Sequence, residues 1–271
     1  METNISWLFY KNYFSEIDFL NPKRERNLTS LKTRNNRIIN ASFYYIPNKL
    51  VQQTIETKVQ YPGLVTGVGI NHEANIEGEF KLGIHFNYTY GMPVIYGSSV
   101  KGLLRNAFPE EKEIKTEKQK RLRESKTKLI RKYLGPGFEF FNIDYLRDWI
   151  FEGKKRYREE GEEKQQNLSI YHRDIFFDAV IAQANSQKKI LAPDSITPHV
   201  KSGILKNPIP LTFLKIAPGV KMEFRFDLKD SNIEGITLLK EQKLQLFKKI
   251  LEDFGIGAKT NVGYGQFSEI K

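Results

Sequence analysis

The C-terminal stretch from Phe254 to Ile270 reads FGIGAKTNVGYGQFSEI. Its glycines enclose a short polar segment, and they stand at Gly255, Gly257, Gly263 and Gly265. Glycine adopts positive φ values and allows a close approach of the backbone. Between the glycines lie a cation and two hydrogen-bonding side chains, namely Lys259, Thr260 and Asn261. This combination predicts a loop that contacts the phosphates of a ligand.

The order of the neighbouring elements indicates the class of ligand. Apolar periodicity predicts a helix over residues 238–254 before the loop and a strand over 265–270 after it. Dinucleotide-binding folds place the glycine loop between a strand and a following helix, which is the reverse order. A clamp on an RNA backbone is therefore favoured over a nucleotide site. A tight turn before an edge strand is the alternative, because glycine is the default residue of turns.

Composition points to a polyanionic partner. The 271 residues carry 43 Lys or Arg against 32 Asp or Glu, which gives a net charge of +11 and a pI of about 9.5. Such an excess favours nucleic acid, although charge also increases solubility. Cysteine is absent, which excludes disulfides and thiolate chemistry and is typical of a reducing, cytoplasmic interior. We expect neither a secretory signal nor a membrane span of ~20 apolar residues.

Local patterns predict ordered elements that alternate with charged segments. We expect helices over 41–58, 98–108, 110–134, 142–151 and 238–254. We expect strands over 64–70, 80–89, 174–182, 211–217, 221–228 and 265–270. The strands on either side of Pro218 and Gly219 are predicted to form a hairpin. Residues 21–40 are predicted as an exposed basic segment and 153–167 as a mobile loop.

Without the charged segments, the order of elements is strand, helix, strand, strand, helix, strand. This order predicts the α+β class, with a ferredoxin-like antiparallel sheet as in RNA-recognition modules. The helices are expected on one face of the sheet, interrupted by charged helical insertions. We predict a single domain over residues 1–271, with an N-terminal extension at 1–60 and a helical insertion at about 109–168.

The segment GSSVKG at residues 97–102 begins the helix predicted over 98–108. Ser98 and Ser99 are typical N-terminal capping residues, and the free N–H groups and dipole of a helix favour a phosphate at this end. Arg105 lies four positions after Lys101, so both side chains share one helix face. The same spacing is typical of a capped helix with an ordinary salt-bridge pair, and both interpretations stay open.

The helix predicted over 110–134 carries ten Lys or Arg against five Glu. A charged helix is most often a solvated face. Because this one directly follows the predicted RNA-facing helix, it is also a candidate to extend the RNA path or to dock a partner. The sequence does not separate these alternatives.

Several segments carry a resemblance to a known family. They are Gly67–Gly78 (GVGINHEANIEG), Gly91–Arg105 (GMPVIYGSSVKGLLR), Asp174–Ala179 (DIFFDA), Pro193–His199 (PDSITPH) and Asn207–Pro210 (NPIP). Together with the glycine-rich loop, they resemble the RAMP superfamily of CRISPR proteins from about residue 63 to the C-terminus. Within that superfamily, the Thr-Pro-His and Asn-Pro-x-Pro elements resemble the sixth subunit of type III-B, or Cmr, effector complexes.

This resemblance implies a non-catalytic backbone subunit of an RNA-guided antiviral complex. The implied partners are the CRISPR guide RNA, target single-stranded RNA, other RAMP backbone subunits and the small helical subunit of the complex. No cofactor, metal or membrane partner is expected. From the loop, the helix start and the resemblance together, the predicted RNA-binding residues are His72, Ser98, Ser99, Lys101, Arg105, Gly257, Lys259, Thr260 and Asn261.

Histidine chemistry supplies the alternative of an enzyme. His72, His172 and His199 are candidates for general acid–base catalysis, as in related RAMP enzymes that process guide RNA with histidine. A histidine beside a carboxylate is more often a hydrogen-bonded structural residue. The sequence has no His-x-x-x-His or cysteine pattern for a metal, and Asp174 with Asp178 favours at most a weak cation site. A third hypothesis is a structural adaptor whose basic surface contacts acidic subunits.

Overall fold

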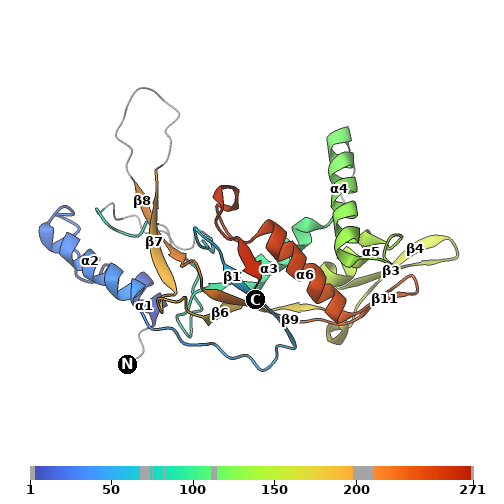
Figure 1. Ribbon diagram of the computed structural model, residues 1–271, viewed down its shortest axis with the longest axis horizontal. Coiled ribbons are helices and arrows are strands. Elements are labelled where there is room, and N and C mark those ends of the chain that lie inside the picture. Colours follow the sequence, from blue (N-terminus) through green and yellow to red (C-terminus); the bar gives the residue numbers. More distant parts are fainter. Residues whose placement is uncertain are drawn as a thin grey trace.

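The computed structural model describes residues 4–67, 74, 76–81, 84–110, 115–197 and 210–269. It consists of helices packed around antiparallel sheets (Figure 1). The largest sheet has the strand order β12-β1-β9-β6-β2, and β5 also pairs with β9. All of these pairings are antiparallel. The strands are β1 (Gln53–Val59), β2 (Val94–Ile95), β5 (Ile175–Phe176), β6 (Ala179–Gln183), β9 (Lys221–Asp227) and β12 (Phe267–Glu269).

Helices α3 (Gly97–Ala107) and α6 (Lys240–Phe254) pack against each other and against this sheet (Figure 1). The buried residues of α6 include Leu246, Phe247 and Ile250, whose spacing of three and four places them on one face. The Phe247 ring lies 5.5 Å from the Phe226 ring of β9 and 5.8 Å from the Phe176 ring of β5. The helices predicted over 98–108 and 238–254 are thus confirmed.

Strand β9 is buried on both of its faces. Its phenylalanines point toward α6, whereas Glu223 and Arg225 alternate to the opposite face. There a segment within residues 41–50 covers them: Arg225 donates to the Ile46 carbonyl at 2.6 Å, and its guanidinium lies 5.1 Å from the Tyr45 ring centroid. The Tyr45 hydroxyl donates to Glu223, which also pairs with Arg225. The two buried charges therefore have partners within the fold.

Between α3 and β5 the chain forms a second group of elements. It contains α4 (Glu117–Leu134), α5 (Ile143–Arg147), the π-helical turn η1 (Asp148–Glu152), the hairpin of β3 (Lys154–Glu159) and β4 (Glu162–Asn167), and the 3₁₀ turn η2 (Ile170–His172). A capping box starts α4, because the Gln119 N–H donates to Thr116 Oγ1 and the Thr116 N–H donates to Gln119 Oε1. Helix α4 packs against α6 and projects from the body of the molecule (Figure 1).

The remaining elements lie toward the other end of the molecule or flank α6. Strand β7 (Leu191–Ile196) pairs with β8 (Leu211–Ile216), and β10 (Ser231–Ile233) pairs with β11 (Ile236–Leu238). The N-terminal helices α1 (Ile5–Tyr10) and α2 (Glu25–Ile39) lie far from α4, and α2 contacts β7 (Figure 1). None of the helices in the described ranges is long and apolar enough to cross a membrane.

The helix predicted over 41–58 is wrong, because residues 53–59 form β1 in the interior of the main sheet. In β1 the side chains of Ile55, Thr57 and Val59 are buried and those between them are exposed, which is the period of two of a strand. An interior strand of the main sheet therefore comes from the first sixty residues. The basic segment predicted at 21–40 also contains order, since α2 buries Leu31 and Ile38.

The mobile loop predicted over 153–167 is also wrong, because these residues form the β3–β4 hairpin. The Arg156 guanidinium pairs with Glu163 across the hairpin at 3.2 Å and with buried Asp148 of η1 at 2.5 Å. Ion pairs to the neighbouring element thus order a segment that contains almost no apolar residues.

The hairpin predicted around Pro218 and Gly219 does not form. Strand β8 pairs with β7, whereas β9 pairs with β1, β5 and β6, so the turn connects two different sheets. The described residues of the strand predicted over 80–89 form only an isolated bridge, between Phe86 and Pro93. Leu64 and Val65 of the predicted strand 64–70 form isolated bridges as well, and residues 68–70 lie outside the described ranges.

A buried ion pair joins α6 to the residue before β5. Lys243 Nζ lies 2.6 Å from Asp174 Oδ2, and neither side chain has exposed surface. Asp174 also accepts the N–H of Lys229 at 2.7 Å. Burial raises the pKa of Asp174 and lowers the pKa of Lys243, and the attraction between the two charges opposes both shifts. Each charge therefore depends on the other for its place in the core.

Replacing Lys243 with Met should destabilise the fold by about 3–5 kcal/mol, because it leaves the Asp174 carboxyl buried without its cation. The double variant Lys243→Met with Asp174→Asn removes both charges and keeps an acceptor for the Lys229 N–H. It should recover most of the loss. Urea unfolding measures the free energy of each variant. A single variant as stable as the wild type would contradict this account of the pair.

Candidate nucleic-acid interface

The glycine loop is a closed turn between α6 and the edge strand β12. The Ile256 N–H donates to the Gly265 carbonyl at 2.9 Å, and the Ala258 N–H donates to the Val65 carbonyl at 2.8 Å. A Cβ atom at Gly257 would lie 2.2 Å from the Val65 oxygen, and one at Gly265 would lie 1.9 Å from the Ile256 oxygen. Contacts within the chain therefore require these two glycines, as the tight-turn interpretation expects.

The tip of the loop is the part that remains accessible. It consists of Lys259 and the 3₁₀ turn η3 (Thr260–Val262). Lys259 has φ +62°, a left-handed conformation that is uncommon for a residue with a side chain. Lys259 and Thr260 are half-buried and Asn261 is exposed, so a cation, a hydroxyl and an amide lie together on one short turn.

Tyr264 anchors this loop to the β7–β8 pair. Its buried ring lies 6.0 Å from the Phe213 ring, and its hydroxyl donates to Asp194 Oδ2 at 2.7 Å. Burial and the nearby carboxylate raise the pKa of Tyr264. Partial burial favours a higher pKa at Asp194, but hydrogen bonds from Lys215 and Tyr264 keep it below its usual range. The loop tip is therefore held on a rigid base.

The start of α3 differs from the expected capping arrangement. The helix begins at Gly97, its N-cap residue is Tyr96, and the Tyr96 side chain does not cap it. Ser98 and Ser99 therefore lie in the first turn, where Ser98 is exposed and Ser99 half-buried. Asp178 Oδ1 accepts the Gly97 N–H at 2.8 Å. One N–H group at the helix start is thus already bound to a carboxylate of the chain.

The two cations predicted on α3 have partners of different kinds. Lys101 is half-buried, and its Nζ lies 5.9 Å from the ring centroid of Phe176. Arg105 Nη2 lies 2.7 Å from Glu152 Oε1, and both side chains of this pair are at least one-third exposed. An exposed pair of this kind contributes little to stability and is readily exchanged for another anion. The salt-bridge interpretation thus applies to Arg105, with Glu152 as its partner.

A further group of residues lies between the glycine loop and α3, and none of them was predicted as part of the site. Val65 bonds to the loop, and the next residue, Thr66, accepts the His85 N–H at 2.8 Å. The His85 ring stacks on the Tyr96 ring, with centroids 4.6 Å apart and an angle of 21° between the planes. No motif marks His85 in the sequence. Contacts from distant parts of the chain create this stack beside the start of α3.

The α3 start and the loop tip attach to different parts of the sheet. The backbone N–H of Phe177, just before β6, donates to the Arg225 carbonyl. Arg225 lies opposite Thr54, near the start of β1, in the strand register. The loop bonds to residues 63–65, beyond the end of β1. The α3 start and the loop are therefore linked indirectly, through Thr66, His85 and Tyr96.

The remaining candidates do not gather in one described site. His72 and His199 lie outside the described residues, and His172 lies exposed in η2. Asp174 pairs with Lys243 and Asp178 binds the start of α3, so these two carboxylates have separate roles. In the described ranges no group of three His, Asp or Glu side chains is arranged to hold a metal ion.

His85 should make stability depend on pH. Burial lowers the pKa of His85 in the folded state, so the unfolded chain, with a pKa near ~6.5, binds the proton more tightly. The stability linked to His85 is complete above that value and is lost as the pH falls. His85→Phe keeps a ring on Tyr96. Its midpoint of thermal unfolding should therefore change less than that of the wild type between about pH 7.5 and about pH 5.5. Exposed His172→Phe serves as the control, and parallel profiles for His85→Phe and wild type would refute the effect.

A family model for the RAMP superfamily matches residues 56–268, from β1 to β12. Among curated proteins, the chain is 27% identical over 235 residues to the CRISPR system Cmr subunit Cmr6 of Pyrococcus furiosus. That match covers 76% of this chain and 65% of the relative, so it spans less than two thirds of the relative's length.

Two solved structures of CRISPR proteins are similar to this chain. A chain in the structure of the type III-B Cmr-beta bound to cognate target RNA has 18% identity and a TM-score of 0.52, over 98% of this chain and 84% of that one. The crystal structure of Cmr6 from Pyrococcus furiosus has 22% identity and a TM-score of 0.46, over 81% and 97% of the two chains. The first similarity concerns the fold alone. The family match, however, includes both α3 and the glycine loop, and the chain belongs to the RAMP superfamily.

Proposed function

We propose that this protein is a non-catalytic, RNA-binding backbone subunit of a cytoplasmic type III-B CRISPR effector complex. The observation that carries the proposal is the match to the RAMP superfamily over residues 56–268, together with the similarity to a Cmr6 subunit. The net charge of +11 supports a polyanionic partner. Guide RNA and target single-stranded RNA are the proposed nucleic acids. Other RAMP subunits and the small helical subunit are the proposed protein neighbours.

The strand order supports a ferredoxin-like plan for the main sheet. The elements β1, α3, β6, β9, α6 and β12 follow one another as strand, helix, strand, strand, helix, strand. In the sheet, β1 and β9 lie between β12 and β6, and β2 adds a further edge strand beside β6. We infer that the chain is a ferredoxin-like module elaborated by the elements between α3 and β5.

The sheet face is a poor candidate for the RNA platform. RNA-recognition modules of this plan stack bases on aromatic residues of the open sheet face. Here the face of β9 that points away from α6 carries Glu223 and Arg225, and the segment with Tyr45 and Ile46 covers both side chains. The α3 start and the loop tip carry the accessible cations and hydrogen-bonding groups instead. The proposed contacts are therefore to Ser98, Ser99, Lys101, Arg105, Lys259, Thr260 and Asn261.

The double variant Lys101→Glu with Lys259→Glu should weaken RNA binding by roughly tenfold or more, because charge reversal removes attraction and adds repulsion. Each phosphate contact on a single strand contributes about 0.7 to the log–log salt slope, so losing two should make the slope shallower by about 1.4. Filter binding of single-stranded RNA over a range of salt concentrations measures both quantities, and thermal unfolding verifies that the fold survives.

A matched control is Lys23→Glu with Lys32→Glu, which makes the same charge change at exposed positions near and on α2. It should retain most of the affinity. Equal losses in both double variants would mean that net charge, and not this site, governs binding. Wild-type binding that is flat between low and high salt would exclude the electrostatic mechanism and favour a structural adaptor.

The isolated chain should not cut RNA. The histidine candidates for acid–base catalysis are far apart in the sequence, and His172 lies exposed in η2. Incubation of purified protein with guide-repeat RNA tests this expectation. Cleavage that disappears in His72→Ala or His199→Ala would instead identify an endoribonuclease of the same superfamily.

A further inference from the structure

More than half of the net charge of the chain resides on one helix. Helix α4 has eight Lys or Arg against two Glu within 18 residues, a net charge of +6 out of +11 for the whole chain. It projects from the body of the molecule, and most residues of its first half are exposed (Figure 1). Such a concentration of like charge on a projecting element is an electrostatic footprint for a polyanion.

Four of the eight cations of α4 share one face of the helix. A surface groove follows the helix and is lined by Lys120, Arg123, Glu124, Thr127, Lys128 and Arg131. These positions recur every three or four residues and therefore share one side of the helix. Lys120 and Lys128 are exposed, whereas Arg123 pairs with Asp144 of α5. The exposed lysines are the members of this face available to a ligand.

The composition of α4 favours a phosphate backbone over a protein partner. The core of a protein interface is depleted of charge and anchored by large apolar or aromatic side chains. Within α4 the only large hydrophobic residue with an exposed side chain is Leu122, at 56% exposure. A row of cations without apolar anchors instead matches the regular negative charges of single-stranded RNA.

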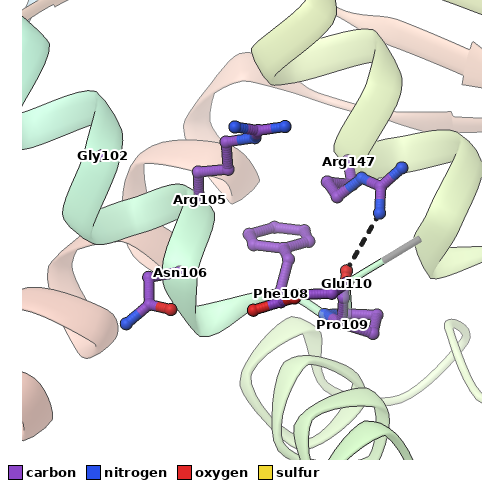
Figure 2. Close-up of a pocket in the computed structure, with 7 residues that line it drawn as sticks. All are labelled: Gly102, Arg105, Asn106, Phe108, Pro109, Glu110 and Arg147. Atoms are coloured by element: carbon purple, nitrogen blue, oxygen red, sulfur yellow. Dashed lines mark hydrogen bonds between the residues drawn. The ribbon is translucent and has the colours of Figure 1, made fainter. Parts of the chain in front are cut away.

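The groove-lining face of α4 meets the residues that follow α3. Arg123, a member of this face, donates to the Glu110 carbonyl, whereas Lys126, on another side of the helix, donates to the Asn106 carbonyl at 2.6 Å. A pocket of about 380 Å³ lies at the end of α3. Figure 2 shows Arg105 of α3 and Arg147 of α5 among its lining residues, which also include Glu110. Arg105 pairs with Glu152 and Arg147 with Asp148, so the exposed lysines Lys120 and Lys128 of α4, and not the pocket, supply the net positive charge of this surface.

Gly102 lines this pocket in the middle of α3. Glycine in a helix interior is less stable than alanine, because it loses more backbone entropy. At Gly97 a neighbouring segment of the same chain requires glycine, because a Cβ atom there would lie 2.3 Å from the carbonyl oxygen of Phe176. At Gly102 a Cβ atom would meet nothing within 4 Å. The absence of a side chain there leaves room for a group from outside the chain to approach the helix backbone.

We propose that the pocket beside Gly102 and the basic face of α4 bind the phosphate backbone of single-stranded RNA as it continues from α3. The proposal rests on the proposed RNA-binding function and extends it. RNA reaches the α3 backbone at Gly102 and then follows Lys120 and Lys128 along α4. An 18-residue helix is about 27 Å long, so this contact requires an RNA longer than the α3 start alone would hold.

The test compares RNA lengths in the full chain. Lys120→Glu with Lys128→Glu should weaken binding of an oligonucleotide of about 30 residues by roughly tenfold and make its salt slope shallower by about 1.4. It should change binding of one of about 8 residues much less, because that length fits a single site. The control is again Lys23→Glu with Lys32→Glu, and equal behaviour of the two double variants on the long RNA would overturn the proposal.

Gly102→Ala tests the pocket separately from charge. It should raise the midpoint of thermal unfolding by roughly 2 °C, because alanine favours the helix. It should also weaken binding of the long RNA, because the added methyl group occupies the approach to the backbone. A more stable variant with wild-type affinity for RNA would remove the pocket from the binding path.

These outcomes separate the inference from the function on which it rests. If wild type binds no RNA, the proposed function itself fails. If Lys101→Glu with Lys259→Glu reduces affinity while the α4 variant binds as tightly as its control, only the α4 proposal fails. An α4 variant that binds long RNA normally but no longer assembles with partner subunits would assign this helix to an acidic protein instead, and would also overturn the proposal.

Discussion

Strand β9 is buried on both faces, and the arrangement of the other elements depends on this constraint. On one face its phenylalanines require an apolar layer, which α6 supplies through Phe247. On the other face Glu223 and Arg225 require polar partners, since buried charges without partners are very costly. The segment with Tyr45 and Ile46 supplies those partners. A strand held in this way has no open face for a ligand, and the proposed binding groups therefore lie at the helix start and the loops.

The same sheet explains the shape of the glycine loop. Strand β12 is an edge strand beside β1, and the chain must return to it directly from the end of α6. The return brings the backbone of the loop against itself and against residues 63–65, where two of the glycines leave no room for a side chain. The glycines thus serve the fold, while Lys259, Thr260 and Asn261 at the tip are available for the proposed RNA contacts.

Charge is divided between structural and available groups. Lys243 and Arg225 are buried in ion pairs, and Arg156 holds a hairpin to its neighbouring turn. Arg105 has an exposed partner, and the outer lysines of α4 face solvent. Net charge by itself does not distinguish these groups. The structure does, because burial and an ion-pair partner determine which cations are free to meet a phosphate.

The sequence by itself determined the helices with strong periodicity, the position of the glycine loop between α6 and β12, and the family. Local information suffices for these features, because apolar spacing and glycine placement act within a few residues. It did not determine that residues 53–59 form an interior strand, that β8 and β9 belong to different sheets, or that Arg156 orders the segment 153–167. Nor did it identify His85, Tyr96 as the N-cap of α3, or the open space at Gly102. Each of these depends on contacts between residues far apart in the chain, and only the tertiary structure brings such residues together.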